Sequence, residues 1–300
     1  MRANVLKAIF YSPNGLRWIW CLILFLLIVA ACVAVIVAPL QLVLSRFNLS
    51  PQIGKPVTGW FSILGSIITL LFAYCAFLLG THLAQRWLRN GTLSSIGLPI
   101  NSTAFVDVLI GLGLGTLIVA FSTFLSWLLG WYQFVGFSWQ FRLANILIPA
   151  VVMSFIASIQ SPLVEEVLFR GFIFQTLSER WSFPGALLFS SFLFGLAHLT
   201  SMENTFWWAA IISTFLAGMM FIQAYLAHKS LWIPIGIHFG WIFSGRLLND
   251  IGQSADKVLF LASDVDGPNL LVAPTGGGAG LFELIGVGIV SLILWRIARK

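Results

Sequence analysis

The chain has 300 residues, of which 59% are hydrophobic and only 9% are charged, and its mean hydropathy is +0.97. Soluble domains carry about 25% charged residues, so this composition excludes a soluble globular protein. The net charge of +6 is typical of a membrane protein with basic loops at an anionic leaflet and does not indicate nucleic-acid binding. The fold class predicted from these values is all-α, as a polytopic helical membrane protein.

Apolar segments follow one another along the chain. Most of them approach the roughly 20 residues that cross a bilayer core as a helix. They lie at 18–42, 58–80, 104–130, 144–163, 185–199, 206–226, 231–247 and 281–298. We therefore predict about eight transmembrane helices, of which the helix at 185–199 is the shortest.

Lys and Arg residues are distributed unequally between the loops on the two sides of these segments. With eight spans, one side holds Arg2, Lys7, Arg17, Arg86, Arg89, Arg180, Lys229, Arg296, Arg299 and Lys300. Because cytoplasmic loops carry an excess of Lys and Arg, this side is predicted to be cytoplasmic, with both termini on it.

Ionisable residues divide the chain into three predicted parts. Residues 1–143 form accessory transmembrane helices in which Asp107 is expected at the solvated interface, and Gly111, Gly113 and Gly115 give a face for helix packing. Residues 144–247 form the core that carries the chemistry. Residues 248–300 form an outer loop and the last transmembrane helix.

Two adjacent glutamates, Glu165 and Glu166, lie in this core within an apolar run. A carboxylate at membrane depth costs several kcal/mol, so it is retained only where it has a partner or a function. Arg170 follows Glu166 by one helical turn and is predicted to pair with it, whereas Glu165 has no such partner nearby in sequence. Pro162 is expected to open or kink this helix, with Ser161 as its N-cap.

Two histidines, His198 and His238, lie in the apolar segments that follow the glutamates. Two histidines and a carboxylate from three helices can bind zinc or position a water molecule, and they can equally form an acid–base set without a metal. Satisfied core histidines and a buried ion-pair cluster that fixes helix packing are the structural alternatives. His82 and His228 lie at segment ends beside basic residues, which indicates interfacial positions.

Three sequence motifs in this core resemble those of the CAAX prenyl protease and bacteriocin-processing (Abi, CPBP) family of intramembrane endopeptidases. Glu165-Glu166-x-x-x-Arg170 reads like the first motif, and Phe194-x-x-x-His198 like the second. The segment Ser230-Leu231-Trp232-Ile233-Pro234 before His238 reads like the start of the third. The resemblance covers roughly residues 150–246.

The resemblance implies a role for each site residue. Glu165 and His198 would activate a water molecule, His238 would stabilise the oxyanion, and Glu166 and Arg170 would support the site. The family's dependence on metal is disputed, so zinc bound by Glu165, His198 and His238 stays open beside a metal-free mechanism. The implied substrate is a membrane-embedded peptide or protein in the lipid bilayer, and the implied location is the bacterial inner (cell) membrane.

One position departs from the family pattern. Ile242 stands four residues after His238, where the family usually has Asn or Asp. Loss of one oxyanion donor costs on the order of 10²–10³ in rate in other enzymes. A catalytically weak or inactive relative that acts as a membrane peptide-binding or immunity protein is therefore the alternative. A transporter is less favoured, because the sequence shows no internal repeat and no matching pair of broken helices.

Overall fold

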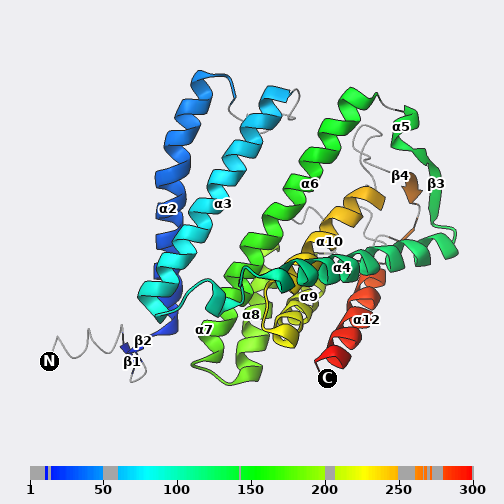
Figure 1. Cartoon of the computed structure of the whole chain (residues 1–300). Coiled ribbons are helices and arrows are strands. Elements are labelled where there is room, and N and C mark those ends of the chain that lie inside the picture. Colours follow the sequence, from blue (N-terminus) through cyan, green and yellow to red (C-terminus); the bar gives the residue numbers. More distant parts are fainter. Residues whose placement is uncertain are drawn as a thin grey trace.

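The computed structural model describes residues 11–12, 15–49, 60–141, 143–199, 207–248, 261–265, 267–268, 271 and 280–298. Each predicted apolar segment lies on a helix of this structure (Figure 1). In chain order these are α2 (Trp18–Arg46), α3 (Trp60–Arg89), α4 (Ser102–Leu128), α6 (Ala144–Glu166), α8 (Phe183–Ala197), α9 (Trp207–His228), α10 (Trp232–Leu248) and α12 (Leu281–Ile297). The short elements η1 (Ser94–Ile96), α5 (Ser138–Phe141) and α7 (Gln175–Ser178) connect them.

Among the described residues, four helices are long and apolar enough to cross a membrane. They are Trp18–Arg46, Ile63–Arg89, Ser102–Leu128 and Ile211–His228, and Phe183–Ala197 is a shorter apolar helix. A helical membrane protein is thus confirmed at this level. The number of eight spans, the cytoplasmic side of the termini and the three-part division of the chain stay predictions.

Helices α2 and α3 pack along each other at one end of the molecule, and the helices of the predicted core lie beside them (Figure 1). Helix α4 packs closely against α10 and also contacts α12, while α9 packs against α8 and α12. The largest buried apolar cluster of the described residues includes side chains from η1, from the π-helix η2 (Val167–Phe174) and from α8, α9, α10 and α12. This cluster surrounds the segment that carries the two glutamates and Arg170.

The packing of α4 on α10 depends on glycines from both helices. A Cβ atom on Gly236 would lie 2.5 Å from the Val108 carbonyl oxygen, and one on Gly115 would lie 2.0 Å from that of Ile237. Only glycine allows this close approach of two backbones. Gly111 and Gly115 therefore form the predicted packing face, whereas Gly113 does not, because a Cβ there would have nothing within 4 Å.

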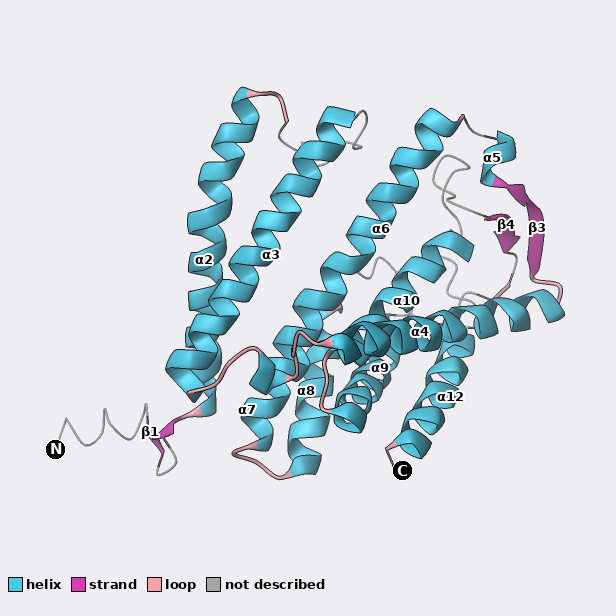
Figure 2. Cartoon of the chain, viewed as in Figure 1, coloured by secondary structure: helices cyan, strands magenta, loops and turns pink. Residues whose placement is uncertain are grey.

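Short strands add to the all-α class that the composition predicted. Strand β3 (Tyr132–Phe137) pairs antiparallel with β4 (Leu261–Val265), with Tyr132 opposite Val265 and an irregularity between Phe134 and Gly136 (Figure 2). Strands β1 (Tyr11–Ser12) and β2 (Gly15–Leu16) form a second small pair. The segment of β4 lies within the predicted outer loop of residues 248–300, and the segment of β3 lies between two predicted transmembrane segments. The aromatic and β-branched residues of β3 have high strand propensity, which explains the difference.

Candidate functional site

The glutamates and Arg170 lie on one continuous helical stretch. Helix α6 ends at Glu166, and the π-helix η2 (Val167–Phe174) carries the chain on to α7. Helix α6 begins at Ala144 and includes Pro162, so the expected helix start at Pro162 with Ser161 as N-cap is wrong. π-Helical turns are rare and are frequent at functional sites. Ser190 of α8 donates a hydrogen bond to the Phe169 carbonyl of this segment, at 3.3 Å.

Arg170 and Glu166 form a buried ion pair, as the sequence predicted. The Arg170 Nη1 atom lies 3.0 Å from Glu166 Oε1, and the two side chains are 1% and 0% exposed. Arg170 Nη2 donates to the Gly218 carbonyl at 3.2 Å. The guanidinium carbon also lies 4.2 Å from the ring centroid of Phe194 and 4.8 Å from that of Phe221, within the range of cation–π attraction.

His238 is held by the same carboxylate. Its Nδ1 atom lies 3.0 Å from Glu166 Oε1, and its ring stacks on Phe221 with centroids 5.0 Å apart. A glutamate paired with an arginine is ionised and can only accept hydrogen bonds, so the proton of this contact belongs to Nδ1. The other ring nitrogen, Nε2, lies 3.9 Å from Glu165 Oε2.

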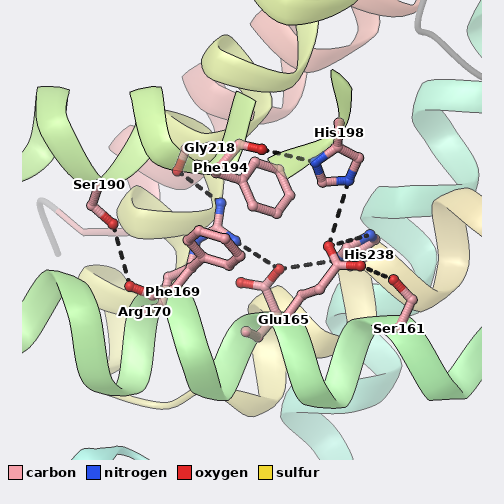
Figure 3. A network of polar contacts seen from close by, with 10 residues as sticks. Ser161, Glu165, Phe169, Arg170, Ser190, Phe194, His198, Gly218 and His238 are labelled. Atoms are coloured by element: carbon pink, nitrogen blue, oxygen red, sulfur yellow. Dashed lines mark hydrogen bonds and ion pairs between the residues drawn. The ribbon is translucent and has the colours of Figure 1, made fainter. Parts of the chain in front are cut away.

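His198 follows the last residue of α8 and is anchored in a similar way. Its Nδ1 lies 2.8 Å from the Phe194 carbonyl oxygen, which accepts hydrogen bonds only, so Nδ1 again carries the proton. Its Nε2 lies 3.6 Å from Glu165 Oε2. Both histidines therefore direct Nε2 toward the same carboxylate oxygen (Figure 3).

Glu165 has a partner that sequence reasoning missed. The Ser161 hydroxyl, one helical turn earlier on α6, donates to Glu165 Oε1. The spacing of four residues on a helix was the available signal. The predicted convergence of Glu165, His198 and His238 is confirmed as geometry, while Glu166 lies at the centre of the Arg170 and His238 contacts.

Two other acidic residues, Asp107 and Glu283, have partners outside the cluster of Glu165, His198 and His238. Asp107 is buried rather than solvated at an interface, and its Oδ1 lies 3.3 Å from Nδ1 of His228, whose side chain is 37% exposed. Glu283 at the start of α12, which the sequence did not single out, accepts a hydrogen bond from Trp241 Nε1 at 3.2 Å. Neither residue contacts the Glu165 group in the described part of the chain. Ile242 lies on α10, one turn beyond His238, and is partly exposed.

The fit of a metal ion depends on how the donor atoms are arranged. The donor types of Glu165, His198 and His238 suit zinc, and each histidine has an anchored Nδ1, as zinc-binding histidines do. Within the described residues, however, no group of three or more His, Cys, Asp or Glu side chains is placed to hold a metal ion. The zinc site stays a prediction from the sequence, and no step below passes through a metal.

The fold and the site together define a helical membrane protein with a partly buried carboxylate–histidine cluster. Residues 147–244 match the family model described as "Type II CAAX prenyl endopeptidase Rce1-like". A Bacillus subtilis (strain 168) protein described as "Putative membrane peptidase YdiL" is 32% identical over 154 residues, which cover 50% of this chain and 57% of that relative. No solved structure matches the chain.

These matches confirm the resemblance drawn from the three motifs. Residues 147–244 are similar to the Rce1-like family of CAAX prenyl endopeptidases, and the match together with the apolar helices indicates an integral membrane protein. The chain spans little more than half the length of the curated relative that it matches. The activity, the substrate and the roles of the site residues are therefore proposals.

Proposed function

We propose that this protein is an intramembrane endopeptidase that hydrolyses a peptide bond in a membrane-associated protein or peptide. One observation carries the proposal: Glu165 Oε2 lies within 4 Å of Nε2 of both His198 and His238 (3.6 and 3.9 Å). These distances exceed those of direct hydrogen bonds, and polar contacts of this length are often bridged by water. The family match and the printed description of the relative support the same class of reaction.

The proposed reaction begins with a water molecule between Glu165 and His198. Glu165 Oε2 accepts one proton of this water, and Nε2 of His198 accepts a hydrogen bond from the other O–H. The water oxygen attacks the peptide carbonyl carbon and gives a tetrahedral intermediate. The proton on Glu165 then passes to the leaving nitrogen and the C–N bond breaks. The products are an amine and a carboxylic acid, which keeps the second proton of the water until it is released to solvent.

His238 is the proposed stabiliser of the oxyanion. Its Nδ1–H is committed to Glu166, so its Nε2 donates a hydrogen bond only when the ring is an imidazolium. Glu166 lies beside Nδ1 and Glu165 beside Nε2, so a carboxylate faces each nitrogen of this ring.

Burial of the side chains indicates the side from which a substrate reaches the site. The side chains of Glu165 and His198 are 23% and 25% exposed, whereas that of Glu166 is fully buried at 0%. The scissile bond would therefore approach over Glu165 and His198, with Glu166 and Arg170 behind them as supports. The proposed location is the bacterial inner membrane, where a membrane-embedded substrate meets the site laterally.

Ile242 favours a second candidate function, a membrane peptide-binding protein without hydrolytic activity. An isoleucine cannot supply the hydrogen bond that Asn or Asp gives at this family position. Under this alternative the site binds a peptide and leaves its backbone intact.

A cleavage assay on a membrane peptide library separates the two candidates. Purified wild type and Glu165→Ala would be compared in lipid vesicles, with and without a chelator. The endopeptidase proposal expects products from wild type that disappear in Glu165→Ala. Peptides that bind without being cleaved would favour the binding protein, and activity lost on chelation and restored by zinc would favour the metal-dependent form.

A further inference from the structure

Ser161 is the side chain that contacts Glu165 from the same helix. Its hydroxyl donates to Glu165 Oε1 from one turn earlier on α6 (Figure 3). Side chains on a helix lean toward its N-terminus, so a glutamate at i+4 naturally reaches back to a serine at i. Both partners of this contact therefore come from one local stretch of α6.

The two oxygens of Glu165 have different surroundings. Oε1 accepts the Ser161 hydrogen bond, whereas Oε2 is buried, has no hydrogen-bond partner among the described residues and faces the two histidines. The terminal torsion of a glutamate is broad, so this carboxylate would rotate freely without an anchor. A hydrogen bond to Oε1 fixes the plane of the carboxylate and leaves Oε2 directed toward Nε2 of His198 and His238.

Other serines of the same kind behave differently. Ser158, on the same helix, donates to the Ser154 carbonyl at 2.6 Å, and Ser126 of α4 donates to the Ser122 carbonyl at 3.0 Å. Bonds of this type to the preceding turn are the usual behaviour of serine within a helix. Ser161 donates to a side chain that lies in the candidate site, which gives it a role that Ser158 lacks.

We propose that Ser161 is a positioning residue of the endopeptidase reaction, and that it holds the Glu165 carboxylate so that Oε2 receives the proton of the attacking water. This inference rests on the proposed function. Ser161 does not contact the reacting atoms, and its effect passes entirely through Glu165. Removal of its hydroxyl should therefore slow turnover without changing substrate binding.

The test compares three variants in the membrane peptide assay: Ser161→Ala, Ser161→Thr and the matched control Ser158→Ala. The hydrogen bonds that support metal-binding side chains are worth about 10–100-fold in activity, and by analogy Ser161→Ala should lower kcat by ~10–100-fold with KM nearly unchanged. Ser161→Thr keeps the hydroxyl and should recover most of the rate. Ser158→Ala should keep the wild-type rate.

Two results would overturn the inference while the proposed function stands. One is a Ser161→Ala protein with wild-type kcat. The other is an equal loss of kcat in Ser161→Ala and Ser161→Thr, accompanied by lower resistance of both variants to unfolding. That result would mean that residue 161 acts through packing and not through its hydroxyl.

A second measurement does not depend on activity. Infrared difference spectra against Glu165→Gln isolate the carboxylate bands of Glu165 in the resting protein. A shift of these bands in Ser161→Ala, absent in Ser161→Thr and Ser158→Ala, would support the inference even if the wild type cleaved no peptide and the proposed function failed. Unchanged bands in Ser161→Ala would overturn it.

Discussion

Removal of the Arg170 charge tests how strongly the buried ion pair supports the site. In Arg170→Met, Glu166 loses its 3.0 Å contact while its side chain stays 0% exposed. Breaking a buried pair in this way costs about 3–5 kcal/mol, because one charge remains buried without compensation. Loss of the cation–π contacts with Phe194 and Phe221 adds about 0.5–2 kcal/mol. We therefore expect roughly 4–7 kcal/mol of destabilisation.

The assay is unfolding by sodium dodecyl sulfate in mixed micelles, followed by tryptophan fluorescence. Arg89→Met is the matched control, because its partner Glu179 is 51% exposed and is solvated when the pair is lost. Pairs of this kind are worth about 0–1 kcal/mol. The double variant Arg170→Met with Glu166→Gln removes both charges and should recover most of the lost stability.

The double variant should nevertheless stay inactive. The neutral amide that Glu166→Gln introduces can still accept the Nδ1–H of His238, but it removes the carboxylate beside a ring that must be an imidazolium to donate from Nε2. If Arg170→Met were no less stable than Arg89→Met, or if the double variant hydrolysed peptides at the wild-type rate, the account of Glu166 and Arg170 as supports of His238 would be refuted.

Two further predictions concern α10 and its contact with α4. Gly236→Ala should lower both the yield of folded protein and the cleavage rate, because its Cβ would lie 2.5 Å from the Val108 carbonyl oxygen. Gly113→Ala is the control and should change neither, since its Cβ would have nothing within 4 Å. Gel filtration measures the yield, and the peptide assay measures the rate. A folded, fully active Gly236→Ala would show that the close crossing does not position His238. Ile242→Asn should raise turnover, by up to about 10²–10³ if the new amide reaches the oxyanion. If the wild type cleaves peptides and Ile242→Asn does not cleave them faster, residue 242 lies too far from the oxyanion to donate a hydrogen bond.

The sequence predicted correctly those features that depend on residues close together in the chain. The apolar segments predicted the main helices in the described part of the chain, because apolar runs of about 20 residues are typical of transmembrane helices. The i, i+4 spacing predicted the pair of Arg170 and Glu166, and the motif resemblance predicted the meeting of Glu165 with the two histidines. The number of spans and the roles of these residues stay predictions.

Other features depend on contacts that a linear sequence does not reveal. Which atom of Glu165 faces the histidines depends on Ser161, and the tautomer of His238 depends on Glu166 from another helix. The pairing of β3 with β4 joins segments more than 120 residues apart in the sequence. Asp107 was expected at the solvated interface, but it is buried beside His228, which comes from a helix about 120 residues later in the chain.

The incorporation of labelled water into the products tests the central claim most directly. Wild type and Glu165→Gln would be incubated with a cleavable membrane peptide in water enriched in oxygen-18, and the fragments would be weighed by mass spectrometry. The account predicts one labelled oxygen at the new carboxyl terminus with wild type, and no fragments with Glu165→Gln. Equal cleavage by Glu165→Gln, or fragments without the label, would contradict water activation by Glu165.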